Sequence, residues 1–142
     1  MRLLVIEDNP HHGASARKFF AGKGFKVDFI NDLKLFVKAM ELYTYDGVLS
    51  DIFFPYDNLD YSGEVPAGVA VLFICKAKAV PCVLVTAGYH HGKKYQWIHT
   101  MLCELGFPLM IDVDGYGMKE VEAPEKNWAE AFEYLTSMIN QK

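Results

Sequence analysis

Acidic side chains follow two short apolar runs of this chain. Glu7 and Asp8 come directly after the first run, and Asp51 comes after the third. A hydroxyl, that of Thr86, follows the fourth run. Carboxylate oxygens are hard ligands that suit Mg²⁺, and three of them in one crevice repel one another unless a cation lies between them. The spacing therefore indicates either a divalent-metal site or acids that are simply solvated in loops.

Histidines stand close to the same positions. Four of them belong to the segments after the first and fourth apolar runs: His11, His12, His90 and His91. Imidazoles beside the carboxylates would favour a softer ion, such as Zn²⁺, Ni²⁺ or Mn²⁺, over Mg²⁺. Loop histidines are also commonly solvated without binding a metal. Both interpretations stay open, with a transition-metal site as the alternative to Mg²⁺.

The elements that must position these side chains alternate along the chain. Apolar runs typical of buried strands occupy residues 3–6, 47–49, 81–85 and 107–113, and residues 25–30 alternate apolar and polar as a strand with one wetter face would. Amphipathic stretches typical of helices lie near residues 11–22, 33–40, 98–105 and 128–139. The apolar residues 68–78 could form a strand or a helix, and their length and their place between two strands favour a helix. This alternation predicts an α/β fold with a doubly wound parallel sheet and helices on both faces. Ligands of such folds bind at the carboxyl ends of the strands, which is where the candidate side chains stand.

The bulk composition limits the possible partners. The chain has 142 residues, 51% of them hydrophobic, which fits a single domain over residues 1–142. Its formal net charge of −4 argues against a protein that coats nucleic acid, and no apolar run approaches the roughly 20 residues of a membrane span. We therefore expect neither a nucleic-acid nor a membrane partner. Cys75, Cys82 and Cys103 lack a CxxC spacing, and we interpret them as buried free thiols in a reducing cytoplasm.

Four short motifs, in order, resemble one known family. "LLVIEDNP" is similar to the first strand and acidic pair of the receiver domains of bacterial two-component response regulators, and "GKGFKV" is similar to their turn into the second strand. "DGVLSDIFFP" resembles their third strand with the phosphoacceptor aspartate, and "PCVLVTAG" resembles their fourth strand. The resemblance implies a flavodoxin-like five-stranded sheet of order 2-1-3-4-5.

The resemblance also implies roles for the candidate residues. Asp51 is the expected phosphoacceptor, Glu7, Asp8 and Asp51 are the expected Mg²⁺ ligands, and Thr86 is expected to bond a phosphoryl oxygen. The implied partners are a histidine kinase or phosphotransfer protein and a downstream protein. We expect no enzymatic activity beyond self-phosphorylation from a phosphodonor and loss of that phosphoryl group.

Two departures from the family pattern stand out. Members carry a lysine at the end of the fifth strand, and the corresponding position, near Val113, has none. The candidates for replacing it are Lys119, which follows the fifth strand, and Lys93 or Lys94, which follow the fourth strand and could reach in from the other side. The segment Tyr56–Pro66 is longer than usual, and we read it as a loop that is either a lid, a docking surface or plain surface variation.

Three hypotheses remain. The first is a stand-alone receiver that is phosphorylated on Asp51 with Mg²⁺ and acts through a partner protein. The second is a pseudo-receiver, a phosphorylation-independent interaction module, which the missing lysine favours. The third is a small-ligand or nucleotide-binding flavodoxin-like domain, although the chain has neither a GxGxxG motif nor a P-loop.

Overall fold

The computed structural model describes residues 1–59, 63–86, 96–106, 109–111 and 126–141. Its main sheet has five parallel strands in the order β2-β1-β3-β6-β7. These strands are β1 (Arg2–Ile6), β2 (Lys26–Ile30), β3 (Gly47–Ser50), β6 (Cys82–Thr86) and β7 (Leu109–Ile111). Every neighbouring pair runs parallel. The flavodoxin-like order 2-1-3-4-5 is therefore confirmed, with β6 and β7 as its fourth and fifth strands.

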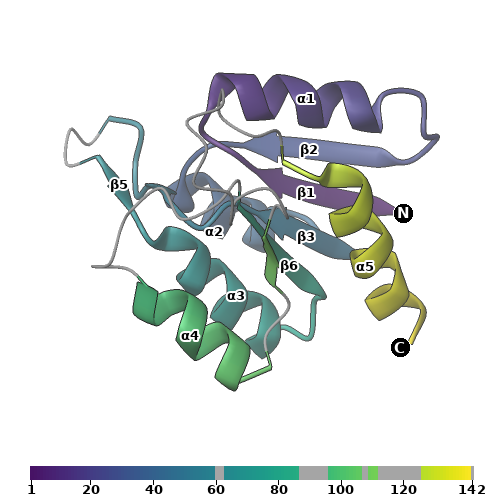
Figure 1. Cartoon of the computed structure of the whole chain (residues 1–142). Helices are drawn as coiled ribbons and strands as arrows, with labels where there is room; N and C mark the ends of the chain where they lie inside the picture. The colour runs from purple at the N-terminus through teal and green to yellow at the C-terminus, as the bar shows by residue number, and fades with distance from the viewer. Residues whose placement is uncertain (60–62, 87–95, 107–108, 112–125, 142) are drawn as a thin grey trace, which may run out of the picture.

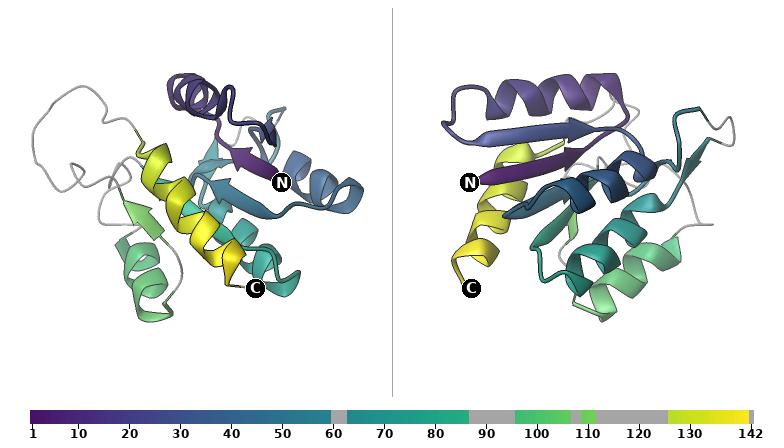
Figure 2. Two further views of the ribbon diagram at one scale, coloured as in Figure 1. Left: turned by 90° about the vertical axis from the view of Figure 1, so that its right-hand side faces the viewer. Right: turned by 180° about the vertical axis from the view of Figure 1, so that it is seen from behind.

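Helices cover both faces of this sheet (Figures 1 and 2). They are α1 (Pro10–Phe20), α2 (Leu33–Leu42), α3 (Ala67–Ala77), α4 (Gln96–Glu104) and α5 (Trp128–Asn140). Buried residues of α1 and α5 pack on one face, and buried residues of α2, α3 and α4 pack on the other. The five helices predicted from the amphipathic stretches are all present.

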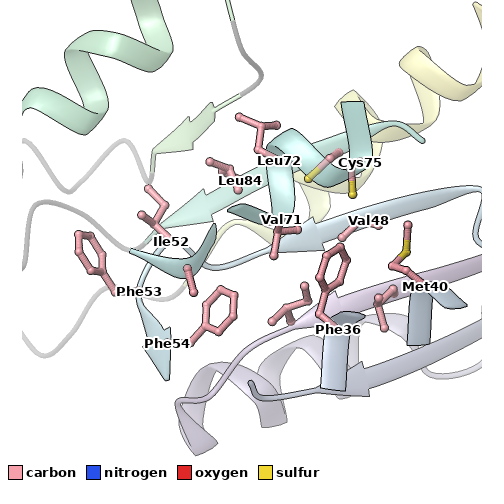
Figure 3. Packing of buried hydrophobic residues seen from close by; sticks show 14 of the residues in the cluster. Phe36, Met40, Val48, Ile52, Phe53, Phe54, Val71, Leu72, Cys75 and Leu84 are labelled. Carbon is pink, nitrogen blue, oxygen red and sulfur yellow. The ribbon is translucent and has the colours of Figure 1, made fainter. Parts of the chain in front are cut away.

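Strand β1 shows why the apolar runs form buried strands. Leu3 and Val5 belong to the core with α1 and α5, whereas Leu4 and Ile6 belong to the core with α2, α3 and α4. Because successive side chains of a strand point to opposite faces, a strand buried on both sides must be apolar throughout. Figure 3 shows the second of these cores, in which Phe36 of α2 is fully buried.

Helix α5 packs very close to the central strand β3. A Cβ atom added at Gly47 would lie 2.9 Å from Leu135 Cδ2, so a larger residue there would require the Leu135 side chain to shift. Since α5 follows a strand of the parallel sheet, it begins at the rim where the strands end. The first residues of α5 are thereby fixed beside the acids predicted to form a site.

The segment after Asp51 differs from the predicted loop. It contains a two-stranded antiparallel sheet of β4 (Phe54–Pro55) and β5 (Glu64–Val65). The prediction of a loop over Tyr56–Pro66 was wrong at Glu64–Val65, which pair with Phe54–Pro55. Phe54 is fully buried and anchors the hairpin in the core. We refer to residues 54–65 as the insert.

The insert is also tied to the start of α2. The Asp32 carboxylate caps α2 by accepting the Leu35 N–H (2.6 Å). It also accepts the backbone N–H and the side-chain amide of Asn58 at 3.2 and 2.8 Å. Asp32 is only 4% exposed, so these hydrogen bonds satisfy a buried carboxylate and fix the insert to the helix.

Two further expectations concern the cysteines and the membrane. All three cysteines are free, and Cys75 and Cys82 are buried as expected. Cys103 is exposed, so its predicted burial was wrong; it lies on the outer side of α4. In the described part of the chain, no helix has the length and apolar character needed to cross a membrane.

Candidate functional site

The ends of β1 and β3 bring three carboxylates together. Ile6 pairs in register with Ser50, and the Asp51 N–H donates to the Ile6 carbonyl (2.9 Å). Glu7, Asp8 and Asp51 each offer an oxygen atom within 4.8 Å of the other two. The structure therefore gathers the three acids that the sequence placed at the strand ends.

A lysine that the sequence analysis did not consider lies among these acids. Lys126, two residues before α5, directs its ammonium to Glu7 Oε2 in a close ion pair and to Asp51 Oδ2 at 3.1 Å. The Lys126 side chain is 2% exposed and that of Glu7 is 1% exposed. The site therefore contains a lysine ammonium although no lysine stands near Val113. It comes from Lys126, just before α5.

Lys126 was missed because only lysines just after the fourth strand and beyond the fifth strand were considered as replacements. These candidates, Lys93, Lys94 and Lys119, lie outside the described residues. A general signal was nevertheless available. In a parallel α/β fold each helix begins at the rim where the preceding strand ends, so a lysine directly before a helix stands at the same rim.

Burial and charge perturb two of the carboxyl groups. Burial raises the pKa of Glu7 to about 7, although the Lys126 ammonium opposes this effect. Burial is also the main reason why the pKa of Asp8 rises to about 7, and the charges of Glu64 and Asp51 add to it. Perturbed acids of this kind are typical of functional sites.

Asp8 has the feature that best fits a cation ligand. Its Oδ1 atom is buried and has no hydrogen-bond partner among the described residues. Leaving a carboxylate oxygen unsatisfied away from water is costly. A divalent cation that binds Glu7, Asp8 and Asp51 would satisfy this oxygen and relieve the repulsion among the three acids.

The insert adds a fourth acid next to Asp8. Glu64 pairs in register with Pro55 across the insert hairpin. A hydrogen bond between the Asp8 and Glu64 carboxyl groups contributes to the raised pKa of Asp8. Such a bond needs a proton on one of the two groups, so it favours the protonated form of Asp8. No sequence pattern predicts this contact, because it depends on the hairpin that returns Glu64 to the rim.

The backbone after Asp51 is held by the start of α3. The Gly68 N–H donates to the Ile52 carbonyl (2.9 Å). A Cβ atom at Gly68 would lie only 2.2 Å from the Asp51 carbonyl oxygen and 2.7 Å from Ile52 Cα. Asp51 Oδ1 itself accepts the Ile52 N–H (2.7 Å), which orients the carboxylate. Gly68 is thus a constraint on the site that sequence reasoning did not find.

Thr86 ends β6 at the same rim. Leu84 pairs with Ser50 of β3, so Thr86 lies beyond the position level with Asp51. Thr86 is 5% exposed. Its role in bonding a phosphoryl oxygen stays a prediction.

His11 and His12 lie on helix α1 and do not belong to the carboxylate group. Asn9 caps α1 by accepting the N–H groups of His11 and His12, so both histidines belong to the first turn of that helix. Among the described residues, the group whose atoms lie close enough to hold a metal ion consists of the carboxylates Glu7, Asp8 and Asp51 alone. His90 and His91 lie outside the described residues. The donor set therefore fits a hard cation such as Mg²⁺ better than a softer one.

Comparison with known proteins gives the fold a name. Full-length FixJ from B. japonicum matches with a TM-score of 0.62 and 20% identity over 99% of this chain and 58% of that one. A two-component response regulator from Clostridium difficile matches with a TM-score of 0.62 and 15% identity over 100% and 97% of the two chains. A structure of histidine kinase ThkA in complex with response regulator protein TrrA matches with a TM-score of 0.60 and 17% identity over 96% and 97%.

These likenesses show that the chain has the fold of response regulator receiver domains, as its motifs led us to expect. The chain spans 58% of FixJ, so its length corresponds to one part of that protein. No protein-family model matches the chain, and no curated protein sequence matches it.

Proposed function

We propose that this chain is a signalling receiver that accepts a phosphoryl group on Asp51. The observation that carries the proposal is the position of the Asp51 carboxylate, which lies at the sheet rim with two further carboxylates and 3.1 Å from a buried ammonium. Phosphoryl transfer depends mainly on positioning and on neutralising charge, and this arrangement supplies both.

In the proposed reaction, an Asp51 carboxylate oxygen attacks the phosphorus atom of the donor. A bond forms between that oxygen and phosphorus, and the bond from phosphorus to the leaving group breaks. The leaving group, acetate from acetyl phosphate or the imidazole of a phosphohistidine, departs with the electron pair. The Lys126 ammonium would then pair with a phosphoryl oxygen, and the Thr86 hydroxyl would donate to another.

Mg²⁺ fits the acidic part of the site. Glu7, Asp8 and Asp51 would hold it, because their oxygens lie together and Asp8 Oδ1 needs a partner. Bound there, it would neutralise the charge of the transferred phosphoryl group. His11 and His12 are not members of the carboxylate group, so this proposal does not use them.

Lys126 removes the main argument for the pseudo-receiver. That alternative was favoured by the absence of a lysine near Val113, and an ammonium is now found at Asp51 from another element. The phosphorylation-independent interaction module therefore becomes an outcome of the test below. As partners we propose a histidine kinase, which one structural neighbour has in its complex, and a downstream protein.

Intact-protein mass spectrometry after incubation with acetyl phosphate and Mg²⁺ tests the proposal. We expect a gain of one phosphoryl group that is lost in Asp51→Asn and strongly reduced when a chelator removes Mg²⁺. Asp57→Asn is the matched control, because Asp57 is an acid of the insert that pairs with Lys34 and does not belong to the carboxylate group of Asp51. A protein that binds Mg²⁺ but gains no mass would be a pseudo-receiver, and one that does neither would point to a ligand-binding domain.

A further inference from the structure

The position of the Lys126 ammonium depends on residues outside the acidic site. Its side chain is almost fully buried, and it is attached just before α5. Lysine has a long, flexible side chain, so a fixed place for its ammonium requires a fixed backbone and packed neighbours. The residues that pack around Lys126 therefore determine whether its ammonium is held beside the Asp51 carboxylate.

The backbone around Lys126 is fixed by the start of α5. The Asn127 side chain accepts the Glu130 N–H (3.1 Å) and donates to the Glu130 carboxylate (2.9 Å). The Trp128 N–H donates to the Lys126 carbonyl (3.0 Å). This hydrogen bond links the backbone of Lys126 to that of Trp128, the first residue of the helix.

Trp128 joins this first turn to helix α1. Its indole is 3% exposed and belongs to the core with α1. The indole Nε1–H donates to Ser15 Oγ (3.0 Å), and Ser15 Oγ donates to the His12 carbonyl (2.9 Å). The Lys126 ammonium lies 5.8 Å from the centre of the Trp128 ring, within the range of a cation–π contact. One side chain thus contacts α1 through its N–H and the ammonium through its ring.

We propose that Ser15 and Trp128 are positioning residues that hold the Lys126 ammonium at Asp51. Neither residue is among the carboxylates and ammonium that form the site. Ser15 fixes the indole, the indole fixes the start of α5, and this turn fixes Lys126. The inference rests on the proposed function of Asp51 for its kinetic consequence, but the placement of Lys126 is measurable without it.

Ser15→Ala is the sharpest test, and Ser137→Ala is its matched control. Ser137 Oγ donates to the carbonyl three residues earlier in α5 (2.7 Å), just as Ser15 does in α1, but it receives no indole N–H. Both variants therefore lose the same kind of hydrogen bond within a helix, from a serine hydroxyl to the carbonyl three residues earlier. Only Ser15→Ala also leaves the indole N–H of Trp128 without its acceptor. Ser15→Thr is the conservative variant: it keeps a hydroxyl and is therefore expected to behave like the wild type.

The first measurement follows Lys126 alone. An amine-acylating reagent is applied to the folded protein, and the labelling rate of each lysine is read by peptide mass spectrometry. Buried Lys126 is expected to react slowly in the wild type and in Ser137→Ala, and roughly threefold to tenfold faster in Ser15→Ala, as expected for the loss of one hydrogen bond. The exposed Lys38 is an internal reference whose rate stays unchanged.

The second measurement follows Asp51. The rate of its labelling by acetyl phosphate is expected to fall by a similar factor in Ser15→Ala and in Trp128→Phe, which keeps an aromatic ring but loses the N–H. Equal Lys126 labelling in the wild type and in both variants would overturn the proposal, as would unchanged Asp51 labelling in both. If wild-type Asp51 is not labelled at all, the proposed function fails, and Lys126 acylation still decides whether Ser15 positions the ammonium.

Discussion

The ammonium of Lys126 lies 3.1 Å from the Asp51 carboxylate, although the two residues come from the start of the last helix and the end of the third strand. The same ammonium is paired with Glu7. One buried cation therefore balances two of the three acids at the rim. Its charge opposes the binding of a metal ion there and favours the arrival of a phosphoryl group.

Lys126→Met is expected to separate these two effects. Removing the charge leaves Glu7 and Asp51 unbalanced, so the free energy of unfolding without metal should fall by about 3 kcal/mol. Mg²⁺ should bind more tightly, because a competing cation is gone, whereas labelling of Asp51 by acetyl phosphate should slow by at least tenfold. Urea denaturation, calorimetric Mg²⁺ titration and mass spectrometry measure the three quantities. Lys119→Met is the control; an equal effect there would show that the role is not specific to Lys126.

Gly68→Ala is expected to disturb the site through the backbone. The new Cβ would lie 2.2 Å from the Asp51 carbonyl oxygen and 2.7 Å from Ile52 Cα, and both are backbone atoms that a rotamer change cannot move away. Overpacking of this kind costs about 1–3 kcal/mol. Gly13→Ala in α1 is the matched control, because its nearest neighbour would be Glu7 Cγ at 3.9 Å and alanine is the better helix former. Urea denaturation should show the first variant destabilised and the second not; equal stabilities would contradict the close approach.

Much of this architecture was predictable from local patterns. The run Leu3–Ile6 is apolar at every position because both faces of β1 are covered, and that pattern predicts a central parallel strand. Once the strands are placed, Glu7, Asp8 and Asp51 must meet, because parallel strands end at one rim. Most of the acidic site therefore follows from the strand boundaries alone.

The other features of the site depend on distant packing. Lys126 reaches Asp51 only because α5 lies against β3 and is linked to α1 through Trp128. Glu64 reaches Asp8 only because the insert forms a hairpin. Gly68 matters because α3 begins against the backbone after Asp51. Such contacts join segments far apart in the chain. For Lys126 the sequence offers only its place directly before a helix, and no periodicity or motif indicates the contacts of Glu64 and Gly68.

Asp32→Ala is expected to release the insert from α2. The substitution removes the cap of the helix and leaves two N–H donors of Asn58 without their acceptor. Loss of a cap costs about 1 kcal/mol, and the unsatisfied donors increase the total to about 2 kcal/mol. Asp57→Ala removes the ion pair with Lys34 and the hydrogen bond that Asp57 Oδ1 accepts from the Leu59 N–H, but it leaves the cap of α2 intact, so it should reduce the stability less. Urea denaturation gives the stabilities, and limited proteolysis should cut the insert faster in Asp32→Ala than in Asp57→Ala; the reverse order would refute the anchoring role of Asp32.

Without metal, the stability of the protein is expected to fall as the pH rises from about 4 to about 7. The pKa of Asp8 is raised from 3.8 to about 7, chiefly by burial, so the folded state holds a proton that the unfolded state has already released. The stability linked to this proton is complete below the unfolded value and is lost as the pH passes the folded one. Thermal melting in a chelator should show this decrease. It should be smaller in Glu64→Gln, which removes a neighbouring charge, and Asp8→Asn should lose the contribution of Asp8. Saturating Mg²⁺ at pH 8 should restore the wild type, and an identical pH profile in Asp8→Asn would show that Asp8 is not the group responsible.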